Sequence, residues 1–109
     1  MTDAVLQRLA ATIHARRTVD ASKSYTRELL DAGPERCAKK LGEEATETII
    51  AALAQDNRAL TREAADLVYH LLVLLESKQV PLSDVLTELK SRMGTSGLAE
   101  KAARDKKAQ

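Results

Sequence analysis

The apolar residues near the N-terminus recur at helical spacing. Val5, Leu9 and Ile13 lie four residues apart, which places them on one face of a helix, whereas a half-buried strand would show strict alternation. We expect this helix to span about residues 3–16. A polar stretch over 18–23 follows, and it separates this helix from the next one.

Capping residues, glycine and proline divide the rest of the chain. Ser24 predicts the start of a short helix, and Gly33 predicts its end. Pro34 suits the first turn of a long helix, because its missing donor is not needed there. Asp56 and Asn57 form a polar break that can cap a fourth helix. The helices are therefore expected at about 3–16, 24–32, 34–55, 58–78 and from Pro81 onward.

The fifth helix carries a regular apolar stripe, and the character of the chain changes after it. The stripe consists of Leu82, Val85, Leu86, Leu89 and Met93. We therefore predict a helical domain over 1–93, followed over 94–109 by a GTSG loop and a charged C-terminal tail.

The fourth helix is apolar almost all the way round. Residues 64–75 read AADLVYHLLVLL, so this helix must be buried on several sides. A single domain of 109 residues builds only a thin core, and a second copy of the chain is the expected cover. The predicted fold is all-α: a four-to-five-helix antiparallel bundle completed by homodimerisation.

Composition supports helices and excludes several functions. The apolar residues are mainly aliphatic, Trp and Phe are absent, and only two Pro and four Gly occur. A net charge of +1 gives no overall field for nucleic acid or membrane binding. The single cysteine excludes an internal disulfide. With no secretory signal and no long apolar run, we expect a cytoplasmic protein.

Carboxylates interrupt the apolar fourth helix. Glu63 and Asp66 share one of its faces with His70, and ionised carboxylates are costly to bury without partners. The third helix has an acidic face of its own, made of Glu43, Glu44 and Glu47, opposite the apolar stripe Leu41, Ala45, Ile49 and Ala52. Helices joined by a short break pack antiparallel, so the two acidic faces are expected to meet.

Clustered carboxylates gather cations or keep their protons. An all-oxygen ligand set without cysteine favours Mg²⁺, with Mn²⁺ as an alternative. Because Mg²⁺ commonly bridges to substrate phosphates, the cluster predicts a phosphate-bearing substrate. His70 is interpreted as a core histidine whose nitrogens are hydrogen-bonded.

The pattern E-x-x-E, fifteen residues, E-x-x-D resembles the metal-binding signature of the MazG-like nucleotide pyrophosphohydrolases. Within that superfamily the chain is similar to the phosphoribosyl-ATP pyrophosphohydrolase family. The similarity is carried by SYTRELL, KKLGEEATETIIAA, EAADLVYHLLVLL and GTSGLAEKAAR. It implies a homodimer that hydrolyses phosphoribosyl-ATP to phosphoribosyl-AMP and pyrophosphate, the second step of histidine biosynthesis. A separate cyclohydrolase is then expected for the next step.

The resemblance also implies roles for particular residues. The metal ligands are Glu44, Glu47, Glu63 and Asp66, and the cation activates a water for attack on the triphosphate. Glu43 or one of the ligands accepts the proton of that water, so the catalytic candidates are Glu43, Glu44 and Glu47. The residue types themselves give the candidates for substrate binding, because a triphosphate needs fixed positive charge and a base can stack on a ring: Lys23, Tyr25, Arg27, Lys39, Lys40, Arg92, Thr95 and Ser96.

Three alternatives remain open. A MazG-like hydrolase of a (deoxy)nucleoside triphosphate would keep the cation and change the substrate. A helical dimerisation module with an acidic groove would have no activity. A di-iron bundle is disfavoured, because such sites use Glu-x-x-His pairs and the chain contains none.

Overall fold

The computed structural model describes residues 3–94 and 101–105. Every regular element in these ranges is helical, which confirms the all-α prediction. In chain order the α-helices are α1 (Asp3–Ala15), α2 (Tyr25–Ala32), α3 (Pro34–Ala54), α4 (Asn57–Ser77) and α5 (Leu82–Arg92). Two 3₁₀ turns, η1 (Arg16–Thr18) and η2 (Ala21–Lys23), join α1 to α2, and residues 101–105 are helical and exposed. Within the described ranges no helix has the length and apolarity to span a membrane.

The helix boundaries follow from the capping residues. Ser24 Oγ accepts a hydrogen bond from the backbone N–H of Arg27 at 3.1 Å and begins α2. Gly33 ends α2 with a φ of 97°, a conformation that glycine adopts without strain. At the start of α4, Asp56 Oδ1 accepts from the backbone N–H of Ala59 at 2.8 Å. The predicted starts and ends agree with these caps to within a residue or two.

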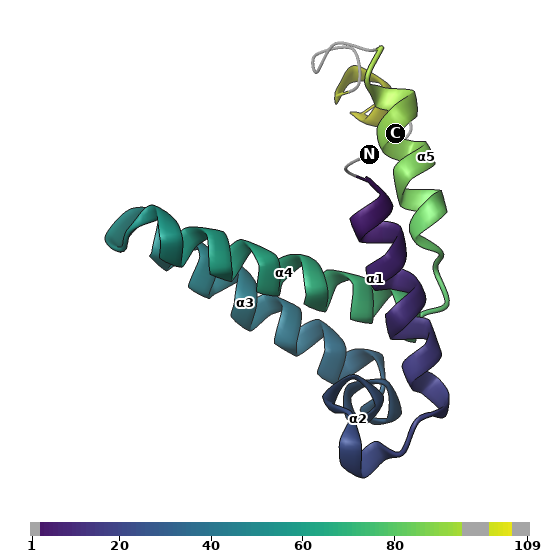
Figure 1. The fold of residues 1–109 in the computed structure, drawn as a ribbon. Helices are drawn as coiled ribbons and strands as arrows, with labels where there is room; N and C mark the ends of the chain where they lie inside the picture. Colours follow the sequence, from purple (N-terminus) through teal and green to yellow (C-terminus); the bar gives the residue numbers. More distant parts are fainter. Residues whose placement is uncertain (1–2, 95–100, 106–109) are drawn as a thin grey trace.

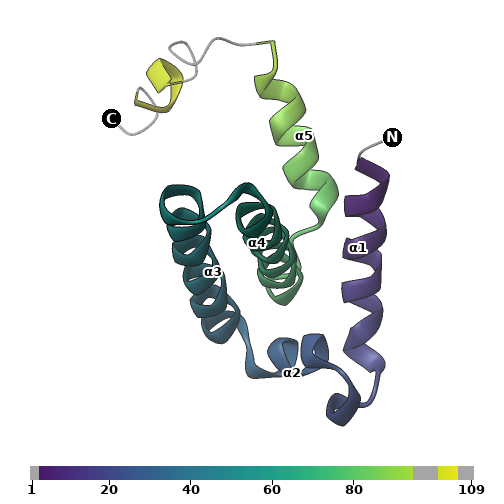
Figure 2. The ribbon, with the colours of Figure 1, turned by 60° about the vertical axis from the view of Figure 1, so that its left-hand side comes forward.

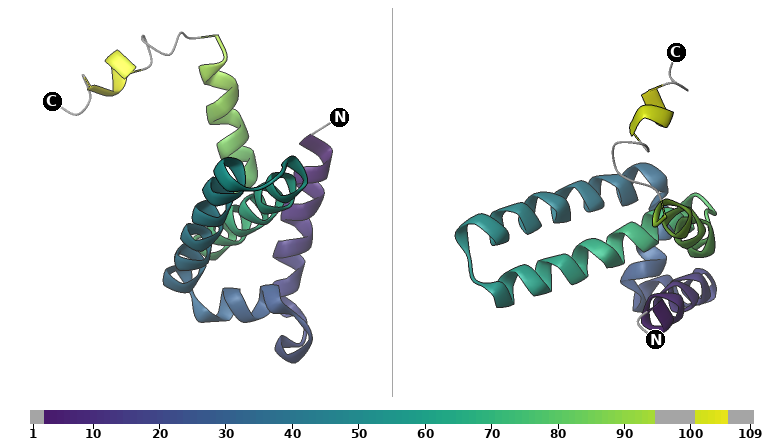
Figure 3. Two further views of the ribbon diagram at one scale, coloured as in Figure 1. Left: turned by 90° about the vertical axis from the view of Figure 1, so that its left-hand side faces the viewer. Right: turned by 90° about the horizontal axis from the view of Figure 1, so that it is seen from above.

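Helices α3 and α4 form a long antiparallel hairpin, as the short break between them predicts (Figure 1). The other long helices do not run along it. In Figure 1 and the right-hand view of Figure 3, α1 and α5 cross the hairpin steeply at the end where α4 finishes. Figure 2 shows α2 near the start of α3, between that helix and α1. The outer end of the hairpin therefore extends beyond the other helices.

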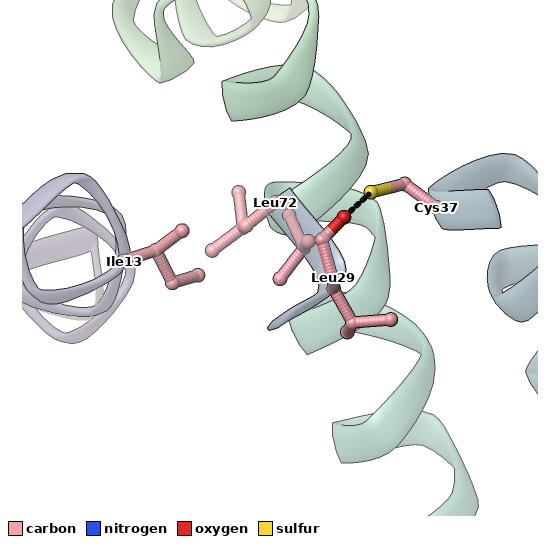
Figure 4. Packing of buried hydrophobic residues seen from close by; sticks show 5 residues of the cluster. Ile13, Leu29, Cys37 and Leu72 are labelled. Atoms are coloured by element: carbon pink, nitrogen blue, oxygen red, sulfur yellow. Dashed lines mark hydrogen bonds between the residues drawn. The ribbon is translucent and has the colours of Figure 1, made fainter. Parts of the chain in front are cut away.

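The hydrophobic core lies where the first four α-helices meet. It contains Ile13 of α1, Leu29 of α2, Cys37 of α3, and Leu72 and Val73 of α4. Figure 4 shows four of these side chains converging and the Cys37 thiol beside the Leu29 carbonyl oxygen, 3.3 Å away. The core is thin, as expected for a chain of this length.

Several large apolar side chains stay exposed in the single chain. On α3 the side chains of Ile49 and Leu53 are 59% and 83% exposed, and on α4 Leu71 is 39% exposed. The predicted stripe of α5 is half-buried at its start, where Leu82 packs against the core, and exposed at its end, where Leu89 is 50% and Met93 84% exposed. The face of α3 that packs on α4 instead carries Cys37, Glu44, Thr48 and Ala51, whereas Ile49 and Leu53 are exposed outside this contact.

Candidate functional site

Three carboxylates from the two helices of the hairpin meet in one place. One side-chain oxygen from each of Glu44, Glu63 and Asp66 lies within 4.8 Å of the others. The Glu44 side chain is only 12% exposed, Glu63 is half-buried and Asp66 is exposed. Three of the four predicted ligands are thus brought together, as the antiparallel hairpin predicts.

The helical period explains this meeting. Glu44 lies on the face of α3 that packs on α4, between Cys37 and Ala51. Glu63 and Asp66 are three residues apart and therefore share a face of α4. Because the helices are antiparallel, the middle of α3 faces the first half of α4, and the acidic pairs lie opposite each other.

A threonine hydroxyl links the backbones of two members of this cluster. Thr48 Oγ1 lies 2.7 Å from the carbonyl oxygen of Glu44 in its own helix and 3.2 Å from that of Glu63 in α4. It is the only proton donor in this contact and shares its single hydrogen between the two carbonyls. Its position four residues after Glu44 was a sequence signal for a shared face, but the threonine was not predicted as part of the site.

Two carboxyls of the cluster, those of Glu44 and Glu63, have raised pKa values. Burial, together with the charges of Glu47 and Asp66, raises the pKa of Glu44. The pKa of Glu63 is also raised, first by a hydrogen bond with Glu47 and then by burial. One buried oxygen on each of Glu44 and Glu63 has no hydrogen-bond partner among the described residues. Like charges gathered around unpartnered oxygens are what a bound cation would neutralise.

Glu47 lies beside the cluster and lines an open groove. Its charge acts on both Glu44 and Glu63. The groove has a volume of about 340 Å³ and is lined by Glu47, Ile50, Gln55 and Glu63. The fourth predicted ligand therefore lies between the acidic cluster and a space open to small molecules.

Glu43 is paired with a lysine at the edge of the site. Its Oε2 is 3.0 Å from Lys40 Nζ, and this hydrogen bond lowers the pKa of Glu43 and raises that of Lys40. Lys40 also interacts electrostatically with Glu44 and Tyr25. A predicted substrate-binding lysine thus stands within reach of the carboxylates.

His70 is buried beside Glu44, but it is not hydrogen-bonded as the sequence interpretation expected. The residue is 6% exposed, and its Nε2 lies 4.0 Å from Glu44 Oε1. Its Nδ1 is buried without a hydrogen-bond partner among the described residues. The expectation of a core position is confirmed, whereas the expectation of satisfied nitrogens is not.

The other predicted substrate-binding residues are spread more widely. Tyr25 is 48% exposed and lies edge-on to His70, with ring centroids 6.2 Å apart. Arg27 pairs with Asp31 at 3.0 Å rather than with the acidic cluster. Exposed positions are occupied by Lys23, Lys39 and Arg92, of which Arg92 pairs with Glu88 at 3.1 Å. Thr95 and Ser96 lie outside the described residues.

The chain is similar to known proteins over most of its length. The phosphoribosyl-ATP pyrophosphohydrolase family matches residues 6–93. A relative from Jannaschia sp. (strain CCS1), named phosphoribosyl-ATP pyrophosphatase, is 59% identical over 99 residues, covering 91% of this chain and 97% of the relative. A protein of the same name from Rhizorhabdus wittichii is 58% identical, covering 93% and 95% of the two chains. A third, from Cereibacter sphaeroides (strain ATCC 17025 / ATH 2.4.3), is 55% identical, covering 92% and 97%.

The matched segment contains all the carboxylates of the acidic cluster. It also covers nearly all of the described helices, from α1 to α5. The chain belongs to the phosphoribosyl-ATP pyrophosphohydrolase family.

Proposed function

We propose that the protein hydrolyses phosphoribosyl-ATP to phosphoribosyl-AMP and pyrophosphate, the second step of histidine biosynthesis. The observation that carries the proposal is the convergence of Glu44, Glu63 and Asp66 inside the segment that matches the family. A triphosphate chain brings several negative charges, so a site for it needs cations rather than bare carboxylates. The acidic cluster is suited to supply them through bound metal.

The cation proposed for this site is Mg²⁺, with Mn²⁺ as a substitute. Glu44, Glu47, Glu63 and Asp66 would hold it. Mg²⁺ binds oxygens at about 2.0–2.1 Å, and oxygens within 4.8 Å of one another can reach one ion by small side-chain rotations. The unpartnered oxygens of Glu44 and Glu63 support this fit. When bound, the cation polarises phosphoryl oxygens and increases the acidity of water.

Residues around the cluster would bind the substrate and move a proton. The general base that accepts a proton from the attacking water would be Glu43, Glu44 or Glu47. Of these, Glu47 borders the open groove. Lys40 offers positive charge to the phosphates from the edge of the site. The half-exposed ring of Tyr25 is suited to stack on the base. Lys23, Arg27, Lys39, Arg92, Thr95 and Ser96 remain predicted substrate contacts.

The exposed apolar surface of the hairpin supports a homodimer. The single chain leaves three large apolar side chains of the hairpin exposed to solvent, those of Ile49, Leu53 and Leu71. A second hairpin packed against them would form a bundle of two α3 and two α4 helices. We also propose that a separate cyclohydrolase performs the following reaction and that the protein acts in the cytoplasm.

Pyrophosphate release tests the proposed activity. The purified protein is assayed with phosphoribosyl-ATP and with a panel of ribo- and deoxyribonucleoside triphosphates, with Mg²⁺ or with a chelator. We expect Mg²⁺-dependent release from phosphoribosyl-ATP above all other substrates. Preference for a deoxynucleoside triphosphate would assign the chain to another reaction, and no release from any substrate would favour a non-catalytic dimerisation module.

Single substitutions connect that activity to the cluster. Glu47→Gln and Asp66→Asn keep the size of each side chain and remove its charge. We expect each to retain the fold and to lose on the order of 100-fold or more in kcat/KM, because a metal site contributes several kcal/mol to the transition state. The wild type, but not Glu47→Gln, should also restore growth without histidine to a strain that lacks this step.

A further inference from the structure

His70 occupies a place in the site that the proposed reaction has not yet used. It lies on α4 four residues after Asp66 and is 6% exposed. Across the helix contact its Nε2 faces Glu44 Oε1 of α3 at 4.0 Å. The imidazole therefore stands directly behind a proposed metal ligand and away from solvent.

Two aromatic rings pack edge-on against this imidazole. The ring of Tyr69 meets it edge-on, with centroids 4.9 Å apart and planes at 77°. Tyr25 approaches in the same manner from α2, with centroids 6.2 Å apart. The Tyr69 hydroxyl is itself fixed by Thr26, whose Oγ1 lies 2.5 Å away. Such packing restricts rotation of His70, so the direction of its Nε2 toward Glu44 is built into the fold.

The hydrogen-bonding state of this pair is incomplete. Nδ1 of His70 and Oε2 of Glu44 are both buried and lack partners among the described residues, although buried polar atoms are nearly always paired. A neutral imidazole carries a single N–H. When that proton is on Nε2, it faces the Glu44 carboxyl group across the 4.0 Å gap.

We propose that His70 is a positioning residue that donates a hydrogen bond from Nε2 to Glu44 and so fixes that carboxylate for cation binding. The inference rests on the proposed function, since it needs a cation at the cluster. Ligating carboxylates are commonly oriented by hydrogen bonds from a second layer of residues, whose loss weakens metal affinity or activity by about 10- to 100-fold. An ionised Glu44 and an Nε2 donor require only a small approach across the 4.0 Å gap.

Three substitutions separate this role from packing. His70→Gln keeps an N–H donor at the position of Nε2, His70→Asn keeps one at the position of Nδ1, and His70→Leu keeps neither. Mn²⁺ binding to each full-length variant is measured by titration with electron paramagnetic resonance, and unfolding is followed with and without Mg²⁺. The matched control is His14→Leu, because His14, the other histidine of the chain, pairs with Glu76 far from the cluster.

We expect Mn²⁺ affinity to fall about 10- to 100-fold in His70→Leu and His70→Asn and to recover in His70→Gln. Unfolding without metal should remain close to wild type in His70→Leu, since an unpartnered nitrogen is removed, whereas stabilisation by Mg²⁺ should shrink. Unchanged Mn²⁺ affinity in His70→Leu, or equal loss in His70→Gln and His70→Leu, would overturn the proposal. A wild-type protein that binds no Mn²⁺ would instead overturn the proposed metal site itself.

Discussion

The hydroxyl of Thr48 in α3 lies 3.2 Å from the carbonyl oxygen of Glu63 in α4. This contact joins the two helices at the height of the acidic cluster, and the same hydroxyl lies 2.7 Å from the carbonyl oxygen of Glu44. A shift of α3 along α4 would break it. The register that brings Glu44 and Glu63 together is therefore held partly by a side chain that bears no charge.

Removing this hydroxyl is expected to loosen the hairpin. Thr48→Val keeps the branched shape and deletes the donor, so we predict a loss of about 1 kcal/mol in the free energy of unfolding, as for a typical buried hydrogen bond. Urea unfolding of the metal-free protein measures it. Thr48→Ser is the control and should lose less, because it keeps the hydroxyl. A Thr48→Val protein as stable as wild type would show that the contact contributes nothing.

The raised pKa values of Glu44 and Glu63 predict a pH dependence. Each carboxyl binds its proton more tightly in the folded chain than its ordinary value of 4.5 implies. Proton binding by these two carboxyls therefore stabilises the folded chain fully below about pH 4.5, and this stabilisation is lost as the pH rises through their raised pKa values. Glu44→Gln should equal the wild type in acid and exceed it in stability at about pH 7–8 when metal is absent.

Thermal unfolding of both proteins from about pH 4 to about pH 8, with a chelator or with Mg²⁺, checks this. Mg²⁺ should reverse the order at neutral pH, because a cation that binds only the folded state stabilises it and Glu44→Gln has lost a ligand. A wild-type protein more stable than Glu44→Gln at neutral pH in chelator would contradict the assigned pKa direction.

Glu76 predicts the opposite behaviour. Burial alone would raise its pKa, but hydrogen bonds from Arg17 and His14 outweigh burial and lower it. The stabilisation is then present above the ordinary glutamate range and is lost as the pH falls through the lowered value. We expect Glu76→Gln to cost about 1–2 kcal/mol near neutral pH and little in strong acid, by urea unfolding.

The matched control for Glu76 is Glu88→Gln on α5. Glu88 pairs with Arg92, but both side chains are well exposed, at 61% and 43%, and such pairs contribute about 0–1 kcal/mol. If Glu76→Gln and Glu88→Gln lowered the free energy of unfolding equally, the hydrogen bonds of Glu76 would contribute no more than an exposed ion pair.

The proposed dimer predicts that a charge on its apolar surface separates the subunits. Ile49→Glu places a carboxylate among the exposed apolar side chains of α3, and burying it without a partner is costly. We expect dimer affinity to fall at least tenfold, about 1.4 kcal/mol, measured by sedimentation. Val5→Glu on α1, at a position 63% exposed, is the control and should sediment as wild type. A monomeric wild type would refute the dimer directly.

Much of the fold was predictable because local chemistry determines it. Ser24, Gly33 and Asp56 mark helix ends through hydrogen bonds and backbone freedom that involve only near neighbours. The meeting of Glu44 with Glu63 followed from the helical period and the short connection between α3 and α4. Both are properties of sequence spacing.

Other features of the structure depend on distances between side chains of different helices, which the spacing of residues along the sequence does not determine. The sharing of the Thr48 hydroxyl and the unpartnered Nδ1 of His70 arise from side-chain positions across a helix contact. The steep crossing of α1 over α4 depends on how Ile13 packs near Leu72. The spacing of Arg27 and Asp31, four residues apart, was a sequence signal for the ion pair that they form.

The unequal distribution of the core has a dynamic consequence. Of the described residues, Ala51 is the only buried apolar one in the outer half of the hairpin, 44–66, whereas the inner half packs against the core around Val73. Local opening should therefore begin at the hairpin tip and proceed inward, and amide protons there should exchange with solvent before those beside the core. Because the carboxylates come from both helices of this outer half, an ion bound between them would hold α3 and α4 together there. We expect it to slow amide hydrogen exchange most at the hairpin tip.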